Sequence, residues 1–141
     1  MGAIRKSVEL EYPRLMVWDA ITNRKDLAEW LMPNDFEPVI GHKFTFQTDP
    51  APGFDGIVQA EVLELEPPER LAIAWRGGGI DTVVTFVLTE TAKGTRLNLT
   101  HDGFALRQLP IRVILSVGWR GLLRKKLPAH ISQKGGLSDG T

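Results

Sequence analysis

The sequence predicts an α+β fold, in which a curved antiparallel sheet wraps around a long C-terminal helix and two short helices follow the first strand. Three observations support this fold class. The N-terminal residues alternate like a strand and lead into helical spacing, the centre is a series of alternating segments joined by short turns, and a long amphipathic segment follows.

The N-terminal part predicts one strand and two short helices. Residues 4–12 carry mostly apolar side chains at every second position, and Pro13 ends this strand. From Arg14 onwards the apolar residues recur at three- and four-residue steps, with a break near Asn23. Pro33 ends the second helix.

The central part predicts consecutive strands of a meander. Turn residues separate them, among them residues 49–53, the three glycines 77–79, and Lys93 with Gly94. Because the connections are short, neighbouring strands should pair antiparallel, and the sheet should curve around another element. The predicted strands are residues 42–48, 56–66, 70–76, 81–89 and 95–101.

Residues 111–127 predict the helix that the sheet wraps. Pro110 suits a first helical turn, and Pro128 should limit the end. Leu115, Trp119, Leu122 and Leu123 lie away from the predicted polar face. That face carries, at steps of four, Arg112, Ser116, Arg120 and Arg124.

Gly118 and Gly121 interrupt this helix, at a cost of about 1 kcal/mol each relative to alanine. Residues this small in a core-facing helix either allow close packing or leave space unfilled. We expect residues 1–131 to form a single domain and residues 132–141 to be a disordered tail.

Composition excludes several classes of function. The 141 residues are enough for one hydrophobic core, and 43% hydrophobic with 24% charged residues is typical of a globular domain. The absence of cysteine excludes thiol catalysis, zinc–thiolate sites and disulfides. No targeting or membrane-spanning segment is predicted. Arg5 and Lys6 are followed by an alternating segment instead of an apolar run, so no secretory signal is expected and the cytoplasm is the expected compartment. The apolar run 113–119 is far shorter than the roughly 20 residues of a membrane span.

The net charge of zero argues against bulk attraction to nucleic acid. It combines 7 basic and 13 acidic residues in positions 1–70 with 10 basic and 4 acidic residues in positions 71–141. The two halves either neutralise each other or leave a dipolar surface for a partner.

A basic cluster lies near the end of the predicted helix and consists of Arg120, Arg124, Lys125 and Lys126. These positive charges suit the negative C-terminal end of a helix. The alternative is that they bind a phosphate-bearing lipid or nucleic acid, although no aromatic residues lie between them to stack on bases.

The candidates for catalysis are few. His42, His101 and His130 lack the spacing of a metal site, and no serine lies in a nucleophile elbow, so neither metal nor cofactor is expected. His101 follows Leu97 and Leu99 on one strand face and should point inward. There it acts as a hydrogen-bond donor or proton shuttle, or else bonds a backbone group in the turn at Asp102.

Several segments resemble, in order, the family named for activators of the heat-shock-protein-90 ATPase, within the START-like superfamily that also holds the birch-pollen allergen. They are Val17-Trp18-Asp19-Ala20-Ile21-Thr22, Leu27-Ala28-Glu29-Trp30-Leu31, Gly41-His42-Lys43-Phe44-Thr45-Phe46, Asp55-Gly56-Ile57-Val58, residues 64–71, Trp75, Gly94-Thr95-Arg96-Leu97 and His101-Asp102-Gly103-Phe104. The resemblance spans residues 8–127 and implies the helix-grip fold.

The resemblance also implies an elongated cavity between the concave sheet and the long helix, which in such proteins often holds apolar or amphipathic molecules. The alternation of the strands and the helix glycines then give the residues that should line it. These are Phe44, Phe46, Val58, Ala60, Ile73, Trp75, Val84, Phe86, Leu99, His101, Leu115, Gly118, Trp119 and Leu122.

Three functions follow as hypotheses, because members of this superfamily differ widely in function. The first is a domain that binds a small apolar or amphipathic molecule, with Trp75 and His101 as contacts. The second is a protein-interaction module that regulates a chaperone ATPase in the stress response; the eukaryotic activators use a further N-terminal domain, for which this chain has no room. The third is a cyclase- or aromatase-like enzyme with His101 as its acid or base.

Overall fold

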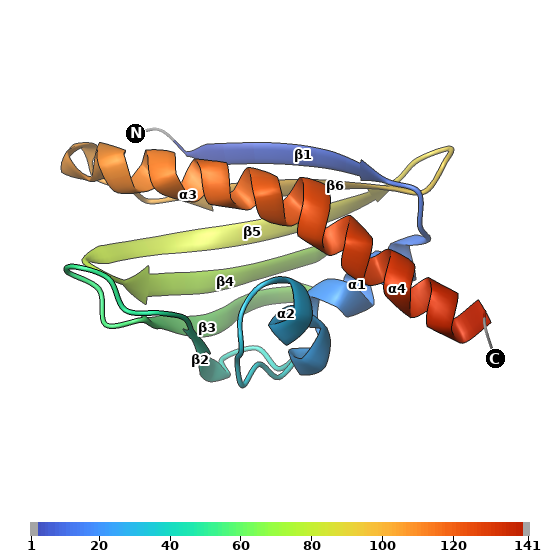
Figure 1. Ribbon diagram of the computed structural model, residues 1–141, viewed down its shortest axis with the longest axis horizontal. Helices are drawn as coiled ribbons and strands as arrows, with labels where there is room; N and C mark the ends of the chain where they lie inside the picture. Colours follow the sequence, from blue (N-terminus) through green and yellow to red (C-terminus); the bar gives the residue numbers. More distant parts are fainter. Residues whose placement is uncertain (1–2, 140–141) are drawn as a thin grey trace.

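The computed structural model describes residues 3–139 and has one antiparallel sheet of six strands, with a long C-terminal helix lying across its concave face (Figure 1). The predicted α+β helix-grip fold is confirmed. The strands are β1 (Ile4–Leu10), β2 (Lys43–Gln47), β3 (Ile57–Glu66), β4 (Arg70–Gly77), β5 (Ile80–Glu90) and β6 (Thr95–Asp102). The helical elements are α1 (Arg14–Ile21), α2 (Arg24–Trp30), the 3₁₀ turn η1 (Leu106–Gln108), α3 (Leu109–Gly121), the π-helical turn η2 (Leu122–Lys126) and α4 (Leu127–Asp139).

The sheet order is β1-β6-β5-β4-β3-β2, so strands β2 to β6 form the expected meander and β1 extends it at one edge by pairing with β6. The register of this last pair sets Ile4 opposite His101. A bulge between Val62 and Glu64 shifts the pairing of β3 with β4, and bulges of this kind bend a strand and increase its twist. The sheet therefore curves towards the helix.

The two short helices close one end of the concave face (Figure 1). Helix α1 starts directly after Pro13, and Asn23 caps α2 by accepting hydrogen bonds from the backbone N–H groups of Lys25 and Asp26. The indole N–H of Trp30 donates to the carbonyl of Ala20 over 2.8 Å, which joins the two helices inside the core.

The C-terminal helix is longer than the sequence predicts. It begins at Leu109, with Pro110 in its first turn, and it continues past Pro128. The π-helical turn η2 ends two residues before Pro128, and the N–H of Leu127 donates to the carbonyl of Leu122, five residues earlier. This wider turn accommodates a proline, whose ring would clash with the carbonyl four residues earlier in a regular α-helix. Among residues 3–139, no helix is long and apolar enough to span a membrane.

The predicted tail, residues 132–141, is helical as far as Asp139, and residues 140–141 lie outside the described residues. Within it, Lys134 Nζ lies 2.9 Å from Oδ2 of Asp26, whose other oxygen, Oδ1, lies 2.8 Å from His130 Nε2. These contacts hold α4 against α2. The domain boundary at residue 131 stays a prediction.

The polar face of the long helix also differs from the prediction. Arg112 and Ser116 are half-buried beside the first residues of β1, whereas Val113, Ile114 and Val117 point outward. The reason is that the first half of α3 lies beside strand β1 at the sheet edge. Polar and apolar residues of the helix border one shallow hollow there, Arg112, Val113, Ser116 and Val117, so the two valines stay exposed. Further along, the core-facing residues are Trp119, Leu123, Leu127 and Ile131, all at most 2% exposed.

Candidate functional site

Two adjoining grooves lie between α3 and the concave face of the sheet. The larger has a volume of about 320 Å³ and is bordered by the loop after β2, the turn between β4 and β5, and the first turns of α3. The smaller, about 130 Å³, continues it along α3 towards Trp119. Met32, Trp75 and Leu115 line both, so the two form one continuous groove.

Glycines shape the wall formed by the loops. Gly78 and Gly79, both with positive φ, form the two-residue turn between β4 and β5, as the sequence predicts for residues 77–79. Phe54 packs on this turn, because a Cβ atom at Gly78 would lie 3.4 Å from the Phe54 side chain. Gly56 has a φ of +86°, and a Cβ atom there would collide with the carbonyl of Thr48. The loop that carries Phe54 therefore depends on glycine at these positions.

Trp75 forms the floor of the groove. Its ring centroid lies 5.2 Å from Phe46, 5.6 Å from His101 and 5.6 Å from Trp119, in tilted or edge-on arrangements that aromatic rings favour. Within residues 3–139 its indole N–H has no hydrogen-bond partner, and no fully buried side-chain nitrogen or oxygen lacks one. The Trp75 N–H is therefore not fully enclosed, although the residue as a whole is only 6% exposed, and it is free to donate to a molecule in the groove.

His101 lies behind Trp75 and is fully buried. Its Nδ1 accepts a hydrogen bond from the indole N–H of Trp119 over 3.1 Å, and its Nε2 lies 2.8 Å from Thr82 Oγ1. Because the Thr82 hydroxyl donates to the carbonyl of Trp75, it must accept from Nε2. These partners select the neutral imidazole protonated at Nε2.

Burial lowers the pKa of His101 to about 4, although the nearby carboxylate of Asp102 opposes this shift. The ring is therefore neutral at pH 7. It does not line the groove, and it forms no hydrogen bond with the backbone of the turn at Asp102. Instead it joins α3, through Trp119, to strands β4, β5 and β6.

A second contact fixes the start of α3. The side-chain amide of Gln108 donates to the carbonyl of Gly79 over 2.7 Å, and its oxygen accepts from the N–H of Ala105. The helix is thus held at Gly79 on one side of the groove and at His101 on the other. The turns between these two points span the groove.

The structure places six of the predicted site residues along the groove: Val58, Trp75, Leu115, Gly118, Trp119 and Leu122. A Cβ atom at Gly118 would meet nothing within 4 Å, so the glycine leaves space unfilled. The other eight lie inside the packed core: Phe44, Phe46, Ala60, Ile73, Val84, Phe86, Leu99 and His101.

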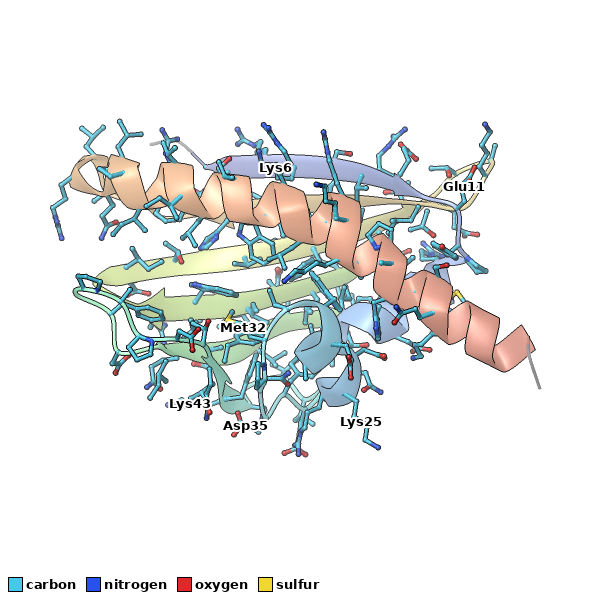
Figure 2. All side chains as sticks on the ribbon, viewed as in Figure 1. Lys6, Glu11, Lys25, Met32, Asp35 and Lys43 are labelled. Atoms are coloured by element: carbon cyan, nitrogen blue, oxygen red, sulfur yellow. The ribbon has the colours of Figure 1, made fainter. Side chains whose placement is uncertain are left out.

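Sequence reasoning missed the residues that loops and the outer turns of α3 bring to the groove. Met32, which follows α2 and is labelled in Figure 2, lines both parts of it. Strand alternation gives no signal for such positions. The remaining lining residues of the larger part are Thr48, Ala51, Pro52, Gly53, Phe54, Gly77, Gly78, Ile80, Ile111 and Ile114.

The electrostatics of the groove are simple, because none of its lining residues is Asp, Glu, Lys, Arg or His. Within the described part of the chain, no group of three His, Asp or Glu side chains is placed to hold a metal ion. The groove can therefore offer apolar contact, an aromatic surface, the Trp75 N–H, the Thr48 hydroxyl and backbone groups. This set favours an uncharged molecule with a flat or aliphatic body.

A hollow of about 690 Å³ at the other end of the molecule is larger, but it has a different character. It lies between the end of β1 and the turn after β5, and charged residues, among them Glu11 and Lys93, border it. An ion pair between Arg96 and Glu9 crosses its rim. Since it lies outside the space between sheet and helix, we consider the smaller apolar groove the better candidate site.

Comparisons with known proteins agree with this architecture. The sequence model of a family described as activator of Hsp90 ATPase homolog 1-like protein matches residues 11–132. Protein MLL2253 from Mesorhizobium loti is 30% identical, with a TM-score of 0.86, over 94% of this chain and 98% of that one. Protein BH1534 from Bacillus halodurans is 27% identical, with a TM-score of 0.78, over 93% and 97%. CalU16 from Micromonospora echinospora is 26% identical, with a TM-score of 0.69, over 96% and 83%. None of the curated proteins matches the chain.

Proposed function

Because the chain belongs to the family of activator of Hsp90 ATPase homolog 1-like proteins, we propose that it binds a small, uncharged, apolar or amphipathic molecule in the groove between α3 and the sheet. One observation carries the proposal: a continuous groove lined without a charged side chain has Trp75 as its aromatic floor, and no described group accepts a hydrogen bond from the Trp75 N–H.

The volume of the groove limits the size of the molecule. About 320 Å³ is at the lower end of the range for small-molecule sites and roughly twice the ~150 Å³ cavity that accommodates benzene. A bicyclic or tricyclic ring system, or a short acyl chain, fits this space. A hydrogen-bond acceptor near one edge would pair with the Trp75 N–H.

The direct test is a titration with Prodan, an uncharged naphthalene fluorophore, followed both by its emission and by ¹⁵N NMR. We expect a blue shift of the emission and resonance changes at the Trp75 indole N–H and at Gly77 and Gly78. Mass spectrometry of the native protein would then identify the molecule that co-purifies with it.

Gly118→Leu is the decisive variant. The new side chain would fill the smaller part of the groove, so Prodan affinity should fall at least about tenfold. Gly121→Leu is the matched control, because it adds the same side chain to the same helix at a position that does not line the groove. Equal affinity in both variants, or resonance changes confined to the outer surface, would contradict the proposal.

The two other hypotheses make different predictions. A chaperone regulator that uses its charged surface would bind the heat-shock-protein-90 homologue of the same cell in a salt-dependent way, and Gly118→Leu would not matter. A cyclase-like enzyme would need an acid or base at the groove. Since both ring nitrogens of His101 already have partners inside the fold, we propose a structural role for this residue.

A further inference from the structure

The outward side of α3 carries an apolar stripe. Leu109, Val113 and Val117, spaced by four residues, are 49%, 54% and 63% exposed, and Ile114 beside them is 69% exposed. Leu106 in the preceding turn is 76% exposed. Large apolar side chains are rarely gathered in this way on a monomer unless the surface has a partner.

Basic residues continue the same side of the helix. Arg120 and Arg124 follow Val117 at three- and four-residue steps and are exposed, as are Lys125 and Lys126. The outward side is therefore apolar over its first turns and basic over the next ones. We call this combined surface, from Leu106 to Lys126, the α3 face.

Most of the positive charge of the α3 face has no ion-pair partner in the described part of the chain; one acidic residue, Glu29, borders the same hollow as Lys126. Residues 103–138 contain no Asp or Glu at all. Within residues 3–139, none of the arginines and lysines of residues 107–126 forms an ion pair. Lys6 on β1 lies alongside this helix (Figure 2), and its pKa is lowered by partial burial and by the positive charges of Arg120 and Arg124. Lys6, Arg120 and Arg124 are thus gathered without an ion-pair partner among the described residues, and a negatively charged partner would supply one.

We propose that the α3 face docks onto the surface of a lipid bilayer that contains anionic phospholipid. Such a surface offers an apolar layer and a layer of phosphates directly beside each other, which is the order found along the helix. The apolar turns would enter the acyl boundary while Lys6, Arg120 and Arg124 meet the phosphates. A nucleic acid would use only the basic half. A second copy of this chain would have to bring its own α3 face, which carries the same charge.

The test is flotation of the purified protein with vesicles of phosphatidylcholine alone and with vesicles containing 30% phosphatidylglycerol. In 0.1 M salt we expect the partition coefficient to be at least about tenfold higher for the anionic vesicles, and to fall steeply when the salt is raised to 0.5 M.

Two double variants separate the α3 face from other apolar surfaces. Val113→Ser with Val117→Ser should lower binding to the anionic vesicles at least about tenfold, and both positions are exposed, so the fold should be kept. Leu63→Ser with Val83→Ser, at 38% and 37% exposure on the opposite side of the sheet, is the matched control and should bind normally. Gly118→Leu should not lower binding to the anionic vesicles, because it adds an apolar side chain to the same helix, whereas it should lower Prodan affinity. This difference separates the proposal from ligand binding in the groove.

Several outcomes would overturn the proposal. These are equal binding to neutral and anionic vesicles, no loss in the Val113→Ser and Val117→Ser variant, or a dimer in sedimentation that this variant dissolves. Binding to a short DNA duplex that is as tight as binding to vesicles and insensitive to the two serines would also overturn it.

Discussion

Both ring nitrogens of His101 are engaged by side chains from different elements, Trp119 on α3 and Thr82 on β5. Strand parity predicts that this histidine points inward, and it does. The sequence could not tell which partners it meets, because Trp119 and Thr82 each lie almost 20 residues away and come together only through folding. The predicted backbone partner in the turn at Asp102 is wrong; Asp102 instead bonds the N–H of Gly103.

The neutral state of His101 predicts a pH dependence of stability. Its pKa is about 4 in the folded protein and ordinarily 6.5, so between these values the unfolded chain binds a proton that the folded one does not. The contribution of His101 to the free energy of unfolding is therefore complete above pH 6.5 and is lost as the pH falls towards 4, by on the order of 3 kcal/mol.

Urea unfolding at pH 7 and pH 4.5 measures this loss. His101→Gln is the control, because its amide does not titrate while the other titrating residues stay the same. The variant should be less stable than the parent at pH 7 and should lose less stability on acidification. Parallel pH profiles of the two proteins would show that His101 is not the responsible group.

Among the elements, α3 is the one with two different halves. Its first turns are tied down at Gln108 and contain no fully buried side chain, whereas from Trp119 onwards the helix is anchored in the core. The continuation of the helix past Pro128 does not follow from the sequence, whereas its start near Pro110 does. Its polar face does not, because helical spacing defines the two sides of an amphipathic helix but not which of them meets the sheet. The position of α3 beside β1 decides that in the tertiary structure.

This difference predicts uneven protection from hydrogen exchange along one helix. Backbone amides of residues 113–118 should exchange faster than those of residues 123–131, since few buried contacts oppose their local opening. Exchange followed by mass spectrometry would show this. Gln108→Ala removes the bond to Gly79 and should speed exchange in the first segment by about three- to tenfold, with little change in the second. A uniform rate along the helix would contradict this view of α3.

At the scale of the whole molecule, the order of strands and helices could be predicted from alternation, helical spacing and turn residues alone. The floor of the groove could be predicted in part, since Trp75 and Leu115 belong to regular elements. Its rim could not, because Met32, Phe54 and the neighbouring loop residues reach it through loops without a periodic signal.

The acidic first half and the basic second half of the sequence neutralise each other only in part. Arg96 pairs with Glu9 and Lys134 with Asp26 across the two halves, while the basic residues of the α3 face stay unpaired among the residues described.

The π-helical turn of residues 122–126 has a consequence for the angular phase of the long helix. Trp119 and Leu127 are eight residues apart, and in an uninterrupted α-helix they would point about 80° away from each other. Both are buried in the same core, because the wide turn absorbs one extra residue. The turn therefore acts as a one-residue insertion, and removing Lys125 would leave a regular α-helix with both side chains still facing inward.

The same removal would bring the ring of Pro128 against the carbonyl four residues earlier, at a cost of about 3 kcal/mol. Deletion of Lys125 alone should therefore destabilise the protein by about that amount in urea unfolding. Deletion combined with Pro128→Ala should recover most of it, whereas Pro128→Ala in the full-length chain should change little. If the two changes simply add in this double-mutant cycle, the inserted residue and the proline are independent of each other.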